Sequence, residues 1–261
     1  MVQTTSQGEA TAQAAERFYD ALAPSYDELT SFEKRFVQEK PFFRLLVEKH
    51  QIKSALDAGS GTGFHSLLLA QLGVSVTALD FSAAMLKKLK RHAIDMRVKI
   101  ETVESSFQQM KQHVNKTFDA VFCLGNTLPH LLTTGELRNT IESFSSLLKP
   151  KGILLIQLLN YERILAEKER VQNVREAGGK VFVRFYDYEE TFITFNILTI
   201  QNVDGVWQHS LQSTRLRPVS EEELGNILTS AGFVDRRIHG SISFDPFDGH
   251  ASRDLVVFAQ K

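Results

Sequence analysis

The sequence has few of the features that direct a protein to a membrane, a nucleic acid or an oxidising compartment. Its one cysteine, Cys123, cannot form a disulfide within the chain, which favours a reducing compartment. The formal net charge of −1 gives no general attraction for nucleic acid or an anionic membrane surface. No apolar run is long enough to span a bilayer. We therefore expect a cytoplasmic protein with neither a nucleic-acid nor a membrane partner.

The N-terminal residues show no targeting signal either. Residues 1–15 are polar, lack the apolar segment of a signal peptide, and predict a flexible tail. The chain has 261 residues, of which 43% are hydrophobic and 23% charged, as is typical of a soluble globular protein. This length suits one domain with an insertion. We expect residues 16–261 to form that domain and residues 161–217 to be an inserted cap.

Short apolar runs alternate with amphipathic stretches over the first 160 residues. One helix is predicted at 33–49, and strands at 53–57, 75–80, 98–103, 118–124 and 153–158. Further strands at 233–239 and 254–259 bring the total to seven. Strands and helices that alternate with short turns predict a doubly wound, mostly parallel α/β sheet.

The pattern changes near residue 181. Three strands at 181–188, 191–202 and 206–217 follow one another without helices, and Asp204-Gly205 is a hairpin turn signal. We expect these strands to form an antiparallel insertion that caps the mouth of the parallel sheet.

A glycine-rich segment, Asp57-Ala58-Gly59-Ser60-Gly61-Thr62-Gly63, lies where the first strand passes into a helix. Glycines at such a turn let the backbone bend tightly and let a ligand approach it. A dinucleotide fingerprint would require glycine or alanine at position 64, where Phe64 stands, and Asp57 would repel a pyrophosphate. The alternative is a glycine turn that binds nothing.

Polar residues follow three of the predicted strands. Asp80 ends the second strand about 20 residues after the glycines, the spacing at which an acid binds ribose hydroxyls; otherwise it is a helix-terminal charge. Ser106 and Phe107 follow the third strand and could hold an adenine, or form an ordinary loop with one core ring. Asn126 and His130 follow the fourth strand, although a lone loop histidine is more often structural. Asp245, Asp248 and His250 indicate a turn, and we predict no metal site.

These motifs together resemble the class I S-adenosylmethionine-dependent methyltransferases, on residues 57–63, 78–80 and 148–152. Within that superfamily the chain is most similar to the glycine and sarcosine N-methyltransferases. The similarity rests on Cys123-Leu124-Gly125-Asn126 with His130-Leu131, and on Asn160-Tyr161 with Ile164-Leu165. It covers the chain from about Tyr19 to the C-terminus.

The resemblance implies a site for S-adenosylmethionine. Arg35 would pair with the carboxylate of the cofactor's methionine, Asp80 would bind its ribose, and Tyr19 and Tyr26 would lie in a segment that closes over it. The full set of expected cofactor-binding residues is Tyr19, Tyr26, Arg35, Asp57, Gly59, Ser60, Gly61, Gly63, Asp80, Phe81, Met85, Ser106, Phe107, Leu124 and His130.

The acceptor is less well defined by the sequence. The resemblance places Asn126 and Tyr161 beside it, but Leu159 stands where the glycine enzymes carry an arginine for the acceptor's carboxylate. An isobutyl group cannot replace a bidentate guanidinium, which makes glycine a poor candidate. Arg184, Tyr186 and Arg215 on the inserted strands could read a polar or anionic acceptor, or could form an exposed strand face.

We therefore predict methyl transfer from S-adenosylmethionine to a small molecule by in-line displacement, at an amine nitrogen, with Asn126 and His130 as the catalytic residues. The protein's part is to align the reacting atoms and to exclude water. One alternative is transfer to an oxygen, with His130 as the base. The other is a protein that binds S-adenosylmethionine or S-adenosylhomocysteine without turnover. The sequence does not decide between a monomer and a homo-oligomer.

Overall fold

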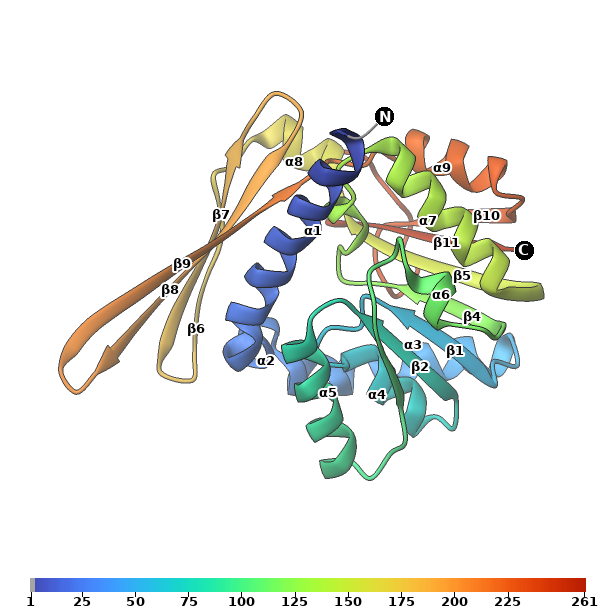
Figure 1. Ribbon diagram of the computed structural model, residues 1–261, viewed down its shortest axis with the longest axis horizontal. Coiled ribbons are helices and arrows are strands. Elements are labelled where there is room, and N and C mark those ends of the chain that lie inside the picture. The colour runs from blue at the N-terminus through green and yellow to red at the C-terminus, as the bar shows by residue number, and fades with distance from the viewer. Residues whose placement is uncertain (1–2) are drawn as a thin grey trace.

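The computed structural model describes the backbone of residues 3–261 and the side chains from residue 13 onward. Figure 1 shows an α/β body on one side, a long antiparallel sheet on the other, and the N-terminal helix between them. Within residues 3–261, no helix is both long and apolar enough to cross a membrane.

The body contains the seven-stranded sheet that the sequence predicts, in the order β10-β11-β5-β4-β1-β2-β3. The pairs β1·β2, β2·β3, β1·β4 and β4·β5 are parallel, whereas β11 is antiparallel to both of its neighbours. The prediction of a doubly wound, mostly parallel sheet is thus confirmed. The strands are β1 (Ser54–Ala58), β2 (Ser75–Asp80), β3 (Glu101–Glu104), β4 (Phe118–Cys123), β5 (Leu148–Leu159), β10 (Val234–His239) and β11 (Asp254–Gln260).

Helices cover both faces of this sheet. One face packs against α7 and α9, through residues such as Phe144 and Leu224, and the other against α3 and α4, through Phe43 and Leu68. Because both faces are buried, the central strands are continuous apolar runs, as expected for parallel strands. The helices of the body are α3 (Phe32–Lys49), α4 (Phe64–Gln71), α5 (Ala83–Asp95), α6 (Met110–His113), α7 (Thr134–Leu147) and α9 (Glu221–Ser230).

Two strand boundaries differ from those predicted by three residues or more. β3 begins at Glu101 rather than at residue 98. β5 begins at Leu148 rather than at residue 153, so the turn-forming sequence Pro150-Lys151-Gly152 lies inside the strand. There Lys151 has a φ of 64° and the pairing with β4 shifts register. A turn signal of this kind therefore marks a bulge, in which the strand bends and continues.

The antiparallel cap has one more strand than the sequence predicts. Its order is β6-β7-β8-β9, formed by β6 (Val171–Ala177), β7 (Lys180–Tyr188), β8 (Ile193–Val203) and β9 (Val206–Leu216). A short helix, α8 (Tyr161–Glu167), precedes it. The sequence gives no sign of β6, because the strand is mostly exposed and its polar and apolar residues do not alternate.

The N-terminal segment also differs from expectation. Residues 1–15 were expected to form a tail, but the backbone is helical over α1 (Gln3–Leu22) and Ala15 is buried. The helix packs into the angle between body and cap, where Phe18 and Leu22 contact Phe182 of β7. A short helix, α2 (Tyr26–Thr30), connects α1 to α3.

Candidate active site

A hollow lies at the carboxyl ends of β1, β2 and β4, under the α1–α2 segment. Ligands of open α/β sheets bind at this edge, because the strand-to-helix turns converge there. Ten of the expected cofactor residues line the hollow together with six others. The lining residues are Tyr19, Tyr26, Thr30, Arg35, Gly59, Ser60, Gly61, Thr62, Phe64, His65, Asp80, Phe81, Met85, Leu124, Gly125 and Thr127.

The glycine loop bends back against β2. Gly59 has a φ of +80°, and a Cβ atom there would lie 2.5 Å from Cγ2 of Thr127, so only glycine fits. The backbone N–H groups of Gly59 and Ser60 donate to the carbonyl of Leu79, at 2.8 and 3.0 Å. These donors are therefore not free to bind a phosphate, which argues against a dinucleotide in this loop.

Asp80 is held at the end of β2 by the backbone. Its Oδ2 accepts from the N–H of Gly61 at 2.8 Å, and its Oδ1 accepts from the N–H of Ser82 at 2.9 Å. Burial raises the pKa of Asp80 to about 6, although these two hydrogen bonds lower it. Each carboxylate oxygen has two lone pairs, so each can accept one more hydrogen bond. Asp80 can thus bind two neighbouring hydroxyl groups.

An apolar slot adjoins Asp80. Met85 is buried in the first turn of α5, where the Ser82 hydroxyl accepts from its N–H at 3.1 Å. Phe81 lies between Asp80 and Ser82, and its ring meets that of Tyr19 edge to face, with centroids 5.9 Å apart. Two apolar side chains next to a carboxylate suit a base attached to a ribose.

The residues expected on the adenine side do not line the hollow. Phe107 packs against the core, with its ring 5.7 Å from that of Phe144 in an edge-to-face arrangement. The backbone carbonyl of Ser106 accepts from the Ser105 hydroxyl at 3.0 Å. For Phe107 the structure therefore favours the alternative of a core ring.

Two residues of the glycine segment are also turned away from the hollow. The Ser66 hydroxyl donates to Oδ2 of Asp57 at 2.6 Å, inside the body, and burial raises the pKa of that carboxyl. Gly63 has a φ of +91° and lies against Leu89. Asp57 and Gly63 thus shape the loop, and the sequence pattern alone could not distinguish this from ligand contact.

Arg35 provides a positive charge at the rim. Its Nε lies 2.8 Å from Oε1 of Glu39, and its guanidinium carbon is 4.3 Å from the centre of the Phe64 ring. The other oxygen of Glu39 is 3.3 Å from Nε2 of His65. Glu39 and His65 were not predicted from the sequence. For His65, the one signal in the sequence was that it follows the glycine loop closely.

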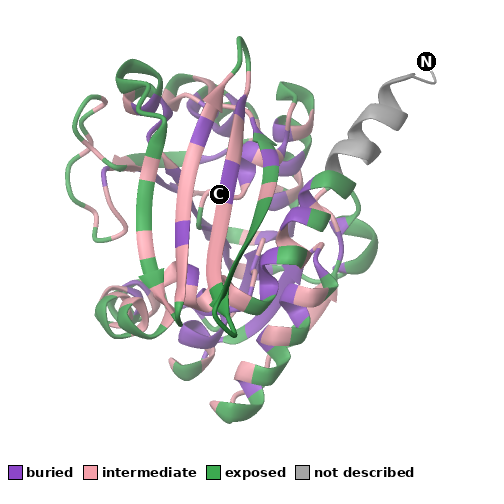
Figure 2. Ribbon diagram, turned by 90° about the vertical axis from the view of Figure 1, so that its left-hand side faces the viewer, coloured by how far each residue is buried: buried purple, intermediate pink, exposed green. Residues whose placement is uncertain are grey.

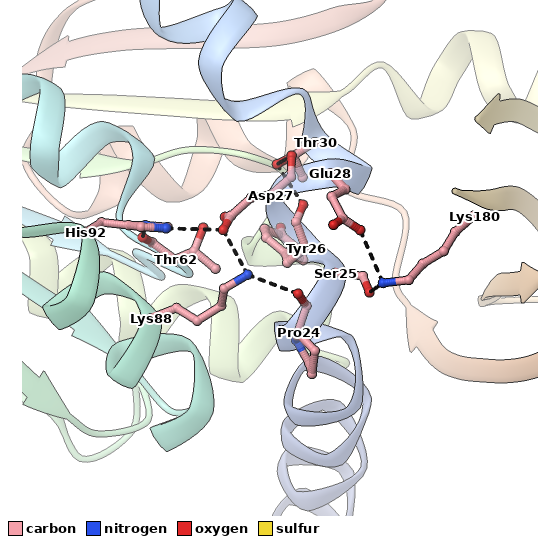
Figure 3. A network of polar contacts seen from close by, with 10 residues as sticks. All are labelled: Pro24, Ser25, Tyr26, Asp27, Glu28, Thr30, Thr62, Lys88, His92 and Lys180. Atoms are coloured by element: carbon pink, nitrogen blue, oxygen red, sulfur yellow. Dashed lines mark hydrogen bonds and ion pairs between the residues drawn. The ribbon is translucent and has the colours of Figure 1, made fainter. Parts of the chain in front are cut away.

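The α1–α2 segment is attached to both the body and the cap, as Figure 3 shows. On the body side, Asp27 of α2 pairs with Lys88 and His92 of α5, at 2.8 and 3.3 Å. On the cap side, Lys180 of β7 donates to the Ser25 hydroxyl at 2.6 Å and pairs with Glu28 at 3.3 Å. These contacts hold Tyr26 over the glycine loop.

The pKa values of this attachment reflect the pairing. Burial alone would raise the pKa of Asp27, but hydrogen bonds from His92, Lys88 and Thr62 outweigh it and lower the pKa to about 2. The same hydrogen bond with Asp27 raises the pKa of His92. Both shifts favour the charged forms, so the pair is an ion pair when the histidine is protonated.

His130 is a neutral side chain that forms a hydrogen bond with the N-terminal helix. Its Nε2 lies 2.8 Å from the hydroxyl of Tyr19. Burial lowers the pKa of His130 to about 4. An imidazole this weakly basic is a poor general base at neutral pH.

Asn126 follows β4 in a left-handed conformation, with a φ of 69°. Its Nδ2 donates to the Tyr161 hydroxyl at 2.9 Å, and its Oδ1 accepts from the N–H of Leu159 at 3.0 Å. The pair of Asn126 and Tyr161 is therefore rigid, as a group that orients a substrate needs to be.

The three predicted residues on the cap strands lie in different surroundings, and Tyr186 is the one beside this pair. Tyr186 is buried in an apolar cluster with Tyr161 and Leu159. Arg184 donates to the carbonyl of Leu29 at 2.8 Å, and burial lowers its pKa. Arg215 lies elsewhere: it pairs with Glu189 at 2.9 Å and its side chain is 57% exposed. For Arg215 the structure favours the alternative of an exposed strand face.

Comparisons with known proteins agree with this fold. Residues 55–152 match the family described as methyltransferase domain. A methyltransferase from Clostridium acetobutylicum ATCC 824, described as S-adenosylmethionine-dependent, superposes with a TM-score of 0.78 at 15% identity. This superposition covers 93% of this chain and 98% of that one.

Sequence relatives point the same way. The glycine/sarcosine N-methyltransferase of Aphanothece halophytica is 37% identical over 150 residues, 58% of this chain and 57% of the relative. The enzyme of that name from Parasynechococcus marenigrum (strain WH8102) is 31% identical over 64% of this chain and 58% of its own length. The chain thus spans little more than half of these relatives. The match of residues 55–152 to a methyltransferase domain and the similarity to these relatives support the resemblance to the class I S-adenosylmethionine-dependent methyltransferases.

Proposed function

We propose that the protein transfers the methyl group of S-adenosylmethionine to an amine nitrogen of a small, anionic acceptor. The observation that supports the cofactor is Asp80, a buried carboxylate at the edge of the hollow with acceptor capacity on both oxygens. The support for an amine acceptor comes from the relatives, which are described as glycine/sarcosine N-methyltransferases.

The residues of the hollow fit the cofactor. Asp80 would accept from the ribose hydroxyls, Phe81 and Met85 would flank the adenine, and Arg35 would pair with the methionine carboxylate. The Ser60 hydroxyl lines the hollow and has no hydrogen-bond partner within the described residues, as expected of a group that binds a ligand. When bound, S-adenosylmethionine supplies a methyl group on a sulfonium, which is already a good leaving group.

The chain's own residues then orient the acceptor and exclude water. Asn126 and Tyr161 form a fixed pair at the end of β4 that would hold the acceptor in line with the methyl group. A neutral amine brings its own lone pair and needs no strong base. The lowered pKa of His130 suits this requirement and disfavours transfer to an oxygen through His130.

Arg184 is the group that we assign to an anionic part of the acceptor. Its Nε is buried without a hydrogen-bond partner, and no carboxylate within the described residues pairs with it. A buried guanidinium with so few partners is costly unless a ligand completes its bonds. Because Leu159 replaces the arginine implied by the family resemblance, the cation would come from the cap instead.

The test is turnover with a panel of amino acids, sarcosine and neutral amines, measured as S-adenosylhomocysteine production. We expect anionic amines to be methylated and glycine to be a poor substrate. Arg184→Met should raise KM for the best acceptor at least about tenfold, since losing a desolvated charge pair costs several kcal/mol. Arg215→Met is the matched control and should change little.

Two results would contradict the proposal. Cofactor binding without turnover of any amine would favour a non-catalytic binding protein. An Arg184→Met variant with normal KM and normal cofactor affinity would remove Arg184 from the acceptor site.

A further inference from the structure

The two faces of the cap sheet differ in what covers them. One face turns toward the body, where Phe182 and Ile197 are buried against α1. Side chains alternate between the faces along each strand, so their sequence neighbours Val183 and Leu198 lie on the opposite, outer face. Figure 2 shows the sheet from the side of Figure 1 on which the cap lies, with its strands in front of the body.

The outer face carries an apolar row across all four strands. The pairing registers place Val174, Val183, Leu198 and Leu211 side by side, from β6 to β9. Val174 is 63% exposed and Leu211 is 52% exposed. Trp207, nearer the tip of β9, points to the same face by alternation and is 68% exposed. Contiguous exposed apolar surface of this kind marks a protein interface.

We propose that this outer face binds the same face of a second copy of the chain. The register makes the face complementary to itself. A two-fold axis that runs along the strands, between β7 and β8, would place Val174 against the partner's Leu211. The same axis would place Val183 against the partner's Leu198. Every contact of the central row is then between two apolar side chains.

The next row supports the same axis. It consists of Glu176, Val181, Ile200 and His209, again from β6 to β9. The axis pairs Val181 with the partner's Ile200 and places Glu176 opposite the partner's His209. The only carboxylate in these two rows would thus face a side chain that can donate to it. A face that binds its own copy must match its polar groups in this way.

The polar end of the face is already paired within the chain. Asp187 pairs with Arg170 at 2.8 Å, and Arg215 pairs with Glu189 at 2.9 Å. Asp187 and Arg215 therefore need no ion-pair partner from a second molecule. The polar end would therefore form the rim of the interface, around an apolar centre.

The size of the patch suits a dimer of modest affinity. Four strands about 4.8 Å apart, over about seven residues of about 3.3 Å each, give a flat footprint of roughly 440 Å². A standard interface buries about 800 Å² of accessible surface per partner. The relief of the side chains and the polar rim add to the footprint, so we expect dissociation in the micromolar range.

The first test is sedimentation velocity between about 1 and 100 μM. We expect the wild type to dimerise, and Val174→Glu and Leu211→Glu to raise Kd by roughly a hundredfold, because each charge enters the symmetric interface twice. Leu45→Glu, on the exposed face of α3 at 66% exposure, is the matched control. Circular dichroism establishes folding of each variant. A wild type that stays monomeric, or a dimer that only Leu45→Glu disrupts, would overturn the proposal.

The second test separates a second copy from any other partner. Glu176→Lys should weaken the dimer. Glu176→Lys combined with His209→Glu on the same chain should restore it, because the new lysine would then lie opposite the partner's new glutamate. Trp207 is the only tryptophan, so its emission should shift to longer wavelength as the dimer dissociates on dilution. Failure of the double variant to recover, together with constant emission on dilution, would show that this face does not bind itself.

Discussion

Among single residues, Asp80 is a buried carboxylate that also lines the hollow. The raised pKa, about 6, means that the carboxyl changes charge just below neutral pH. Only the deprotonated form has both oxygens free to accept from two hydroxyls. In our proposal, the affinity for the cofactor is therefore tied to the protonation of this one group.

We predict that binding of S-adenosylmethionine weakens as the pH falls from 7.5 to 5, and that Asp80→Asn removes most of this dependence. At pH 7.5 the variant should lose about 1–3 kcal/mol of binding free energy, the value of hydrogen bonds to a charged acceptor. Isothermal titration calorimetry at several pH values measures both effects. Asp95→Asn, an exposed change at the end of α5, is the control. Equal pH dependence in wild type and Asp80→Asn would assign the titration to another group.

Other single residues show why the site is assembled as it is. Thr127 follows β4 and lies against Gly59 of the first loop, so the two strand ends can meet only if position 59 has no side chain. Leu159 is a second residue whose type affects the site. It lies in an apolar cluster beside Tyr186, where the family resemblance implies an arginine, and in our proposal Arg184 of the cap binds the acceptor's charge instead.

Among the elements, α2 connects the body to the cap beside the hollow. Its contacts with Lys88 and His92 of α5 fix it to the body, and those with Lys180 fix it to the cap. The segment is short, and ion pairs account for much of its attachment. Its stability should therefore depend on pH more than that of the buried sheet.

The two pKa shifts set the pH window. The pKa of Asp27 is lowered from 3.8 to about 2, so its contribution to stability is present above pH 3.8 and is lost as the pH falls toward 2. The pKa of His92 is raised above 6.5, so its contribution is present below pH 6.5 and is lost as the pH rises through the raised value. The ion pair of Asp27 and His92 therefore contributes most to stability between pH 3.8 and pH 6.5.

We predict that a histidine titration by NMR gives His92 a pKa above 6.5, and that Asp27→Asn lowers it, because the imidazolium loses its carboxylate partner. Hydrogen exchange of residues 26–30, corrected for its intrinsic pH dependence, should be slowest near pH 5–6. Asp95→Asn again serves as the control. An unchanged His92 pKa in Asp27→Asn would mean that the ion pair does not form in solution.

In the whole molecule, α1 lies between two sheets with different roles (Figure 1). The parallel sheet presents the glycine loop and Asp80 to the hollow, and the cap carries Tyr186 and Arg184, the residue that we assign to the acceptor. A ligand that contacts both should stabilise the whole assembly, because it binds the folded state and not the unfolded one.

We predict that S-adenosylmethionine and S-adenosylhomocysteine raise Tm while NAD does not. At a ligand concentration of about 100 times Kd the stabilisation is about 2.7 kcal/mol. For a chain of this size that corresponds to roughly 5–10 °C in Tm. Differential scanning fluorimetry gives the result directly. A shift with NAD and none with S-adenosylmethionine would contradict the assignment of the cofactor.

The sequence alone determined the parallel sheet, the glycine turn and the place of Asp80. These follow from local rules: apolar runs make buried strands, glycines permit tight turns, and the carboxyl ends of parallel strands share one edge. The location of the hollow, at the carboxyl ends of β1, β2 and β4, could be read from that pattern.

The tertiary structure decided which side chains reach the hollow. Asp57 and Phe107 have suitable types and positions, yet they turn inward to Ser66 and Phe144. Thr127 lines the hollow without any sequence signal, and the one signal for His65 is its position shortly after the glycine loop. It also made a helix of the expected tail, since α1 fills the angle between two sheets that no local pattern brings together. The physical reason is that side-chain direction depends on packing against residues far away in the sequence, and local propensity carries no information about that packing.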